Sequence, residues 1–354
     1  MSHKVLHSKL FIPPKFLEMP SVSIEIEPRG ITFLSAKNTE KGLLPLTHGF
    51  IPFQEGTITL GEMVKKEPII KALIDIRKKT GVSFARLSIP EEKTYIFKTH
   101  LPNLKPKEIH DILDFKIEEN VPLSAKEAVF DYDIIPSLED ASGLEVVVSV
   151  AALTMVEELE GVLDQAGLTP VLFSPESNNV AKAVIKSSNE QVIVIANIRE
   201  SKIILSLVIY GVVCQTSSIN FGSSTFTELL ARYFRVSFEE ALLIKKKKLY
   251  SDNVLSLELF SYFINTFSAI KDEVFKFISY CNERKDVTGQ VDRVILCGHD
   301  ALIVGLDKYL SLNLNMRVDV ANIWLNNFDL DTYVPEISKV DSLDLAVVNG
   351  LSLF

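Results

Sequence analysis

Apolar residues follow two different rhythms along this chain. In short stretches such as Ser21–Glu27 they alternate with polar residues, which places Val22, Ile24 and Ile26 on one face of an extended segment. In longer stretches such as Val254–Cys281 they recur at every third or fourth position, the spacing of one helix face. Strand-like and helix-like stretches alternate throughout, so the pattern predicts an α/β fold.

The first half of the chain predicts an opening run of strands and then a compact block with the order strand, helix, strand, strand. A helix over Gly61–Thr80 separates them and ends at Gly81, a residue suited to the left-handed conformation that closes helices. The predicted strands are Ser21–Glu27, Ile31–Ala36, Gly42–Phe53, Ser83–Ile89, Lys93–His100, Ala128–Ile135, Glu145–Ala152 and Leu168–Ser174, and the further helices are Lys105–Asn120, Thr154–Ala166 and Ser174–Ser187.

The second half begins after the polar stretch Lys186–Glu190 and repeats the opening order of strand, sharp turn, strand, strand, helix. Two similar halves that face a cleft are the layout of actin-like and sugar-kinase-like proteins. The predicted strands are Gln191–Asn197, Lys202–Ile209, Val212–Ile219 and Arg293–Cys297, and the helices are Gly222–Phe234, Ser237–Lys246, Val254–Cys281, Ala301–Leu310 and Asp344–Leu353.

The composition is that of an ordinary folded protein. Of 354 residues, 47% are apolar and 23% are charged, which excludes disorder as the main state. The net charge of −9 disfavours nucleic acid as a partner, because phosphates attract basic side chains. The mean hydropathy of +0.21 is high, yet the apolar runs are shorter than the roughly 20 residues that a membrane-spanning helix needs. We therefore expect many buried strands or an apolar docking surface.

The N-terminal segment Met1–Pro20 carries Lys4, Lys9 and Lys15 and lacks the continuous apolar stretch and the cleavage site of a secretion signal. We expect a flexible basic arm. The three cysteines lie far apart in the sequence, which argues against a zinc ribbon or a disulfide scaffold and favours a reducing cytoplasm.

Candidate chemistry is sparse outside the cleft. Asp131 and Asp133 share a strand face but have no apparent acid or base partner, so we expect both to be solvent-exposed surface residues. His100 and His110 lack the spacing of metal ligands, and His299 reads as a loop residue. No catalytic residue and no metal ligand is predicted.

Several soft motifs occur in an order that resembles the PilM family, the actin-like proteins of type IV pilus assembly, and more distantly FtsA of cell division. Each motif is weak alone, and the resemblance rests on their number and their order. The motifs are Arg86–Pro102 (RLSIPEEKTYIFKTHLP), Glu108–Ala128 (EIHDILDFKIEENVPLSAKEA), Val146–Glu176, Ser237–Lys245 (SFEEALLIK), Val291–Gly305 and Asp344–Leu353 (DLAVVNGLSL).

The resemblance implies a two-lobed actin-like fold with an inserted strand–helix–strand–strand subdomain of the SHS2 type, termed 1C. The implied divisions are an arm over residues 1–20, the first lobe (1A) over 21–90, the 1C insert over 91–173, a connection over 174–190, and the second lobe (2A and 2B) over 191–354, with a C-terminal helix that returns to 1A.

The first nucleotide-binding turn departs from the family pattern. Relatives resemble Asp-Ile-Gly, where Asp positions Mg²⁺ and Gly lets the backbone approach phosphate. This chain has Glu25 in place of the Asp and Glu27 in place of the Gly, followed by Pro28, which removes a backbone donor, and Arg29. Glu27 therefore puts a carboxylate where phosphate is expected.

The second turn and the rest of the pocket are also altered. Asn197 stands in place of the second Asp and Arg199 in place of the second Gly. Other positions of the implied nucleotide cleft keep single features of the pattern, and they are Lys202, Gly222, Thr227, Lys245 and Gly298. Because both turns change together, we expect ATP and Mg²⁺ binding to be lost or altered and no cofactor to be required, although bound ATP with Mg²⁺ stays an alternative.

The leading hypothesis is therefore a cytoplasmic scaffold of a type IV pilus or a related machine, more a binding protein than an enzyme. The resemblance implies that it docks the cytoplasmic N-terminal tail of a PilN-like single-pass membrane partner in a groove between 1A and 1C, which would recruit it to the inner face of the membrane. Contact with the membrane would then be indirect.

Three alternatives remain. An active actin-fold ATPase would use Arg29, Lys202 and Lys245 in place of the usual phosphate cradle. An FtsA-like filament protein would carry an amphipathic helix after the last core helix, whereas this sequence stops at Phe354. A small-molecule kinase of the same superfamily is disfavoured by the 1C-like block and the altered turns.

Overall fold

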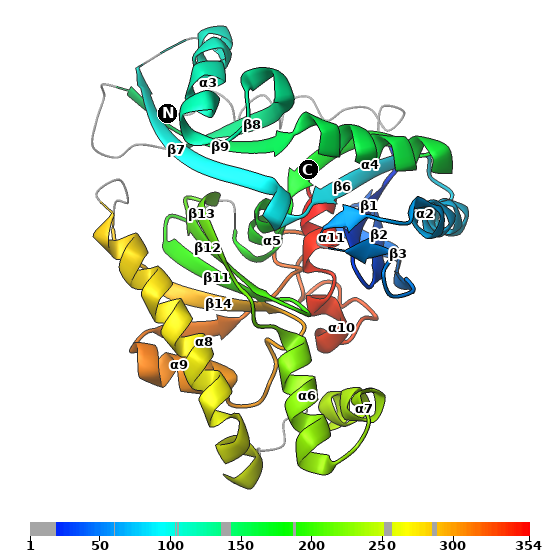
Figure 1. Ribbon diagram of the computed structural model, residues 1–354, viewed down its shortest axis with the longest axis vertical. Helices are drawn as coiled ribbons and strands as arrows, with labels where there is room; N and C mark the ends of the chain where they lie inside the picture. Colours follow the sequence, from blue (N-terminus) through cyan, green and yellow to red (C-terminus); the bar gives the residue numbers. More distant parts are fainter. Residues whose placement is uncertain are drawn as a thin grey trace.

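The computed structural model describes residues 19–354 except 60, 103, 105, 136–142, 187–188, 251–256 and 285–288. Most of the predicted arm, Met1–Pro20, lies outside the described residues, as do part of the predicted boundary Lys186–Glu190 and the predicted helix start at Val254. The chain forms two halves with a smaller unit beside the first half (Figure 1). Among the described residues, no helix has the length and apolar character that crossing a membrane requires.

The first half is a five-stranded sheet with the strand order β10-β6-β1-β2-β3. β1, β2 and β3 form an antiparallel meander, and β6 and β10 add in parallel to its β1 side. Helices α2 and α4 share a core with one face of this sheet. The elements are β1 (Ser21–Glu27), β2 (Gly30–Thr39), β3 (Gly42–Pro52), the short pair β4 (Ile58–Thr59) and β5 (Glu62–Met63), α2 (Lys66–Thr80), β6 (Phe84–Ile89), α4 (Leu153–Ala166) and β10 (Thr169–Pro175).

The second half repeats this topology in the strand order β13-β12-β11-β14-β15. Its first three strands again form an antiparallel meander, and β14 and β15 again add in parallel. The repeated strand order confirms the predicted likeness of the two halves. The elements are β11 (Val192–Ile198), β12 (Ile203–Ile209), β13 (Val212–Ile219), α6 (Ser223–Phe234), α7 (Phe238–Lys248), α8 (Leu257–Glu283), β14 (Arg293–Gly298), α9 (Leu306–Leu314) and β15 (Arg317–Val320).

The third unit is a three-stranded antiparallel sheet with the order β7-β9-β8. Ile109, Leu113 and Ile117 of its helix α3 are buried with Val146 and Val148 of β9 in a core separate from the two larger ones. The elements are β7 (Thr94–Pro102), α3 (Pro106–Asn120), β8 (Ala128–Ile135) and β9 (Gly143–Ala152). The predicted insert 91–173 is too long, because α4 packs with the first sheet and β10 pairs with β6.

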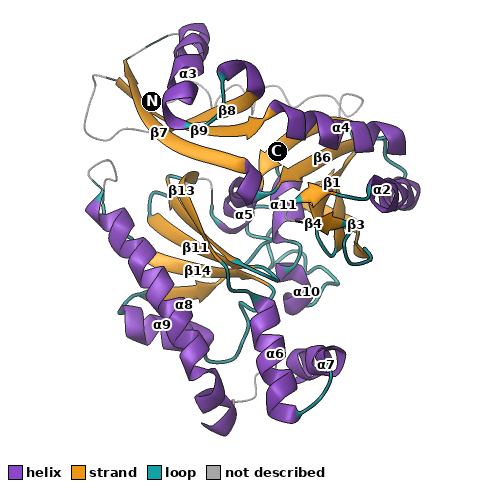
Figure 2. Ribbon diagram, in the orientation of Figure 1, coloured by secondary structure: helices purple, strands orange, loops and turns teal. Residues whose placement is uncertain are grey.

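Two buried helices lie between the two large sheets (Figures 1 and 2). They are α5 (Glu176–Val184), which follows β10 directly, and α11 (Ala346–Ser352) at the C-terminal end of the described chain. Gly350 of α11 lies so close to α5 that a Cβ there would overlap the carbonyl oxygen of Asn179. The close approach of these two helices joins the halves through a common core.

Some predicted bounds are wrong for local reasons. α2 begins at Lys66 because Glu62–Met63 forms the short strand β5. The helix predicted over Ala301–Leu310 begins at Leu306, after Gly305 adopts a left-handed conformation (φ 89°). β15 and α10 (Lys339–Leu343) were not predicted, since each is too short to show a clear period.

Replacing Gly350 and replacing Gly161 with alanine should change the free energy of unfolding in opposite directions. Gly350→Ala forces the added methyl group against α5 and should lower the free energy of unfolding by about 1–3 kcal/mol or prevent folding. Gly161→Ala in α4 meets open space and should raise it by about 0.5–1 kcal/mol, because alanine favours helix. Urea unfolding of both variants measures whether the free energy of unfolding falls or rises. Equal changes in the two variants would contradict the close contact between Gly350 and α5.

Candidate functional site

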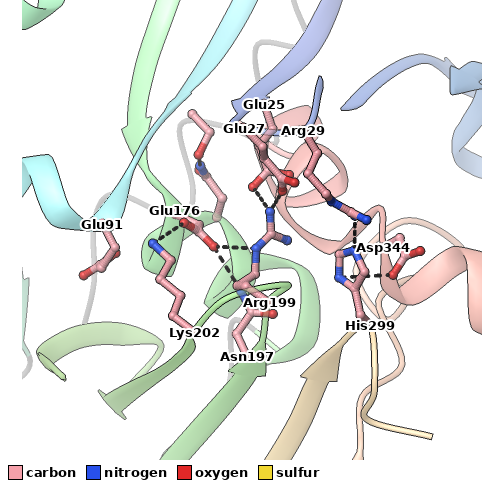
Figure 3. Close-up of polar contacts among 12 residues, drawn as sticks. Glu25, Glu27, Arg29, Glu91, Glu176, Asn197, Arg199, Lys202, His299 and Asp344 are labelled. Carbon is pink, nitrogen blue, oxygen red and sulfur yellow. Dashed lines mark hydrogen bonds and ion pairs between the residues drawn. The ribbon is translucent and has the colours of Figure 1, made fainter. Parts of the chain in front are cut away.

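The β1–β2 turn of the first half and the β11–β12 turn of the second half face each other, and α5 begins beside them (Figure 3). The predicted site residues Glu25, Glu27 and Arg29 come from the end of β1 and the first turn, and Asn197 and Arg199 come from the end of β11 and the second turn. The structure therefore brings together residues that lie about half the chain apart, as the predicted cleft requires.

Arg199 reaches from the second half into a pocket of carboxylates. Its Nη2 lies 2.6 Å from Glu25 Oε1 and also contacts Glu27, and its Nε lies 3.1 Å from Glu176 Oε1. The side chain of Arg199 is only 7% exposed. Buried charges are costly to remove from water, and they are tolerated when ion pairs and hydrogen bonds compensate them. We name Arg199, Glu25, Glu27 and Glu176 the interlobe cluster.

Two further side chains position Glu176 at the start of α5. Asn197 Nδ2 donates a hydrogen bond to Glu176 Oε1 (3.2 Å), and Lys202 Nζ lies 3.9 Å from Glu176 Oε2 while it also contacts Glu92. Burial, with the negative charges of Glu25 and Glu91, holds the pKa of Glu176 well above its usual value, against the opposing effect of Lys202. Three carboxyl groups surround the single guanidinium of Arg199, and burial favours the protonated form of Glu176.

A second layer of polar contacts surrounds Arg29. Its Nη1 lies 3.2 Å from Glu200 Oε2, and its Nη2 lies 3.1 Å from Nε2 of His299. Burial and the nearby charges of Arg199 and Arg29 hold the pKa of His299 well below its usual range. The neutral ring accepts from Arg29 through Nε2, so we assign its proton to Nδ1, which lies 3.5 Å from Asp344 Oδ1. Burial raises the pKa of Asp344 to about 6.

The main-chain donors at the start of α6 are used within the protein. Ser223 N–H donates to the Arg199 carbonyl and Ser224 N–H to the Glu200 carbonyl, each at 2.9 Å. The predicted site residue Gly222 precedes them, and a Cβ there would overlap the Glu200 carbonyl. The start of α6 therefore holds the β11–β12 turn in place.

The predicted residues Thr227, Lys245 and Gly298 do not join the interlobe cluster. Lys245 Nζ contacts Ser223 Oγ at 2.7 Å and Asp300 at 3.1 Å, and Tyr250 also donates to Asp300. Thr227 donates to the Ser223 carbonyl at 3.3 Å. Gly298 takes a left-handed conformation (φ 85°) beside the carbonyl of Ile198.

Sequence reasoning missed Glu176, Glu92, Asp344 and Asp300 as members of these clusters. Glu176 was part of a motif, but nothing local marked it as a partner of Arg199. Within the described residues, no group of three His, Cys, Asp or Glu side chains is arranged to hold a metal ion.

The contacts between the two turns lie between two cavities. One, of about 330 Å³, opens toward β4, β5 and α4, and the other, of about 480 Å³, opens toward α7 and α10. Glu27, Arg29 and Glu200 line both. The bridge between the halves therefore divides the cleft.

A separate groove of about 450 Å³ lies between the three-stranded sheet and the first half. Its walls are β8 and β10, each of which is the last strand of its sheet. Val129 of β8 and Val171 and Phe173 of β10 line it, and Val171 is 38% exposed. The main-chain N–H of Tyr132 on the β8 edge donates to Asp131 Oδ1 (2.8 Å). The groove thus presents two strand edges and an apolar floor.

Comparison with known proteins relates the whole chain to one family. The family model described as type IV pilus assembly protein PilM matches residues 23–353. The solved PilM-PilN type IV pilus biogenesis complex contains a chain of 16% identity and TM-score 0.75, with 94% of this chain and 98% of that chain covered.

Two other solved structures share the fold at lower similarity. MreB5 of Spiroplasma citri bound to AMPPNP is 14% identical with a TM-score of 0.58, covering 97% of this chain and 96% of that one. The ethanolamine utilization protein EutJ from Carboxydothermus hydrogenoformans is 14% identical with a TM-score of 0.55, covering 97% and 91%. The fold is therefore actin-like.

The retained proton on Glu176 predicts a pH dependence of stability. A carboxyl whose pKa is raised in the folded state contributes stability below its unfolded pKa and loses it as the pH rises through the folded value. Glu176→Gln keeps the shape of the protonated group and cannot ionise. As the pH rises above about 5, where an ordinary glutamate is ionised, the free energy of unfolding of the variant should therefore rise relative to wild type. Urea unfolding at several pH values measures this difference. If the free energy of unfolding changed with pH in the same way in wild type and variant, Glu176 would not retain the proton.

Proposed function

This chain belongs to the PilM family of type IV pilus assembly proteins, and we propose that it acts as a scaffold that works without Mg-ATP and docks the N-terminal tail of a PilN-like membrane partner. The observation that carries the first part is the interlobe cluster, where Arg199 of the second half contacts Glu25 of the first half and Glu176 at the start of α5. The observation that carries the second part is the groove between the β8 and β10 edges.

The residues at the two turns do not suit Mg-ATP. A phosphate group needs main-chain donors that face it, and Mg²⁺ needs oxygen ligands that are free to coordinate. The first N–H groups of α6 donate to the carbonyls of Arg199 and Glu200, and Glu25, Glu27 and Glu176 all face the guanidinium of Arg199. Arg199 thus occupies, as a permanent cation, the position between carboxylates that a divalent ion would need.

A permanent cation also removes the need for a nucleotide to bring the halves together. Separation of the halves would break the contacts of Arg199 with Glu25 and Glu27. These contacts join ionised groups, and hydrogen bonds of that kind are stronger than those between neutral groups. The cluster therefore favours the closed arrangement on its own.

The groove suits an extended apolar segment. β10 is seven residues long, so its edge offers roughly 23 Å of strand for pairing. Pro170 and Pro175 have no N–H, which shifts the available donors toward the β8 edge, where Tyr132 N–H is held only by its neighbour Asp131. A tail that adds as a strand would gain main-chain hydrogen bonds and bury its apolar side chains against Val129, Val171 and Phe173.

We place the protein in the cytoplasm under this proposal, at the inner face of the membrane, because the tail of the partner would hold it there. The contact with the membrane is then indirect.

Calorimetric titration of the purified protein with Mg-ATP at millimolar concentration should give no binding heat. Glu27→Gly with Arg199→Gly removes the carboxylate and the guanidinium from the cleft and should create measurable affinity. The matched control replaces the exposed pair Glu228 and Arg232 on α6 with glycine and should stay without binding. Micromolar binding by wild type would instead favour the second candidate, an ATP-binding protein that uses the 480 Å³ cavity beside Lys246 and Tyr250.

A synthetic peptide with the N-terminal tail sequence of a neighbouring PilN-like protein should bind with a Kd of about 1–100 μM. Val171→Arg places a long charged side chain in the groove and should weaken binding roughly tenfold or more. Leu312→Arg, at an exposed position of α9 away from the groove, is the control. Fluorescence anisotropy measures all three proteins. Equal affinity of the Val171 and Leu312 variants would contradict docking in this groove.

A further inference from the structure

The charged side chains that line the groove between β8 and β10 are both acidic. Asp131 lies on β8 and Glu160 on α4, and the other described lining residues are apolar, small or uncharged. Apolar walls with two carboxylates favour an extended segment in which lysine or arginine side chains flank apolar ones.

The N-terminal arm of this same chain has that chemistry. The sequence Lys9-Leu10-Phe11-Ile12-Pro13-Pro14-Lys15 sets three large apolar residues and two prolines between two lysines. Consecutive prolines restrict the backbone to extended conformations, which lowers the entropy lost when such a segment binds. The arm also carries Lys4, and Glu18 is the acidic residue within its first 18 residues.

The start of β1 lies close to the groove. Ser21 of β1 pairs with Phe84 of β6, and Phe84 pairs with Thr169 of β10, so Ser21 is two strand spacings, or about 10 Å, from the β10 edge. The residues between Lys15 and Ser21 can span up to roughly 20 Å when extended. The segment Lys9–Lys15 is therefore within reach of the groove of its own chain.

From this charge complementarity and reach, we propose that the segment Lys9–Lys15 docks in the groove between β8 and β10 of its own chain and competes there with the partner's tail. Leu10, Phe11 and Ile12 supply the apolar contacts, and the two lysines face Asp131 and Glu160. The competition rests on the proposed docking of the tail, whereas the docking of the arm does not.

Attachment makes even a weak segment an effective competitor. A short tether holds its end at an effective concentration of about 1 mM. If the free segment bound with a Kd of about 0.1 mM, the tethered segment would fill the groove in roughly nine of ten molecules and lower the apparent affinity for the tail about tenfold.

Cysteine trapping in the full chain tests the docking of the arm. Ile12→Cys combined with Val171→Cys should form an intramolecular disulfide under mild oxidation, which mass spectrometry of the digested monomer detects. The native cysteines Cys214, Cys281 and Cys297 are buried, and Ile12→Cys with Leu312→Cys is the matched control, since Leu312 is 82% exposed on α9. Equal yields from both pairs, or cross-links only between molecules, would overturn the proposal.

The competition is tested by measuring tail binding to protein variants in which the charge of the arm is reversed. Lys9→Glu with Lys15→Glu should raise the affinity for the PilN-like tail peptide up to about tenfold, because the arm no longer suits Asp131 and Glu160. Lys37→Glu with Lys41→Glu makes the same charge change on exposed residues of the β2–β3 turn region and should leave the affinity unchanged. An equal rise in both variants, or none in the arm variant, would overturn the competition. If no protein binds the tail, the proposed function fails, and the disulfide yield still decides whether the arm docks.

Discussion

The structure depends on a buried guanidinium between the two halves. Arg199 extends from the β11–β12 turn. Its partners Glu25 and Glu27 lie at the end of β1, next to the β1–β2 turn, and Glu176 starts the helix between the sheets. Charges removed from water must keep their partners within hydrogen-bond reach to offset the cost of desolvation. The relative position of the two turns is therefore fixed closely, and the altered turn residues Glu27 and Arg199 compensate each other.

This cluster is linked directly to the groove by the chain itself. β10 forms one wall of the groove and ends at Pro175, and the next residue is Glu176, which contacts Arg199. Glu91, which follows β6, accepts a hydrogen bond from Ser177 N–H (3.2 Å) at the same helix start. The strand that would pair with a docked segment and the helix that carries part of the interlobe cluster are thus one continuous piece of backbone.

The sequence pattern predicted the α/β class, most strands and the repeated order of the two halves, because alternation and helical spacing are local signals. It also predicted that Glu25, Glu27, Arg29, Asn197, Arg199 and Lys202 would meet at one cleft. It missed Glu176 and Asp344 as partners, because only the topology brings them beside Arg199 and His299. It also listed Lys245 and Thr227 with this cleft. Lys245 lines the 480 Å³ cavity together with Arg29, but its Nζ contacts Asp300 and Ser223, and Thr227 donates to the Ser223 carbonyl. A carboxylate whose partner lies far away in the sequence shows no local sequence pattern that marks it.

The most direct test of this account is the distance between the halves in solution, measured by pulsed electron spin resonance on labels at Lys71→Cys in α2 and Leu312→Cys in α9. Both positions are exposed and lie on different halves. The account predicts one narrow distance distribution without nucleotide, unchanged by Mg-ATP and broadened by Arg199→Met. A broad distribution that narrows only when Mg-ATP is added would contradict it.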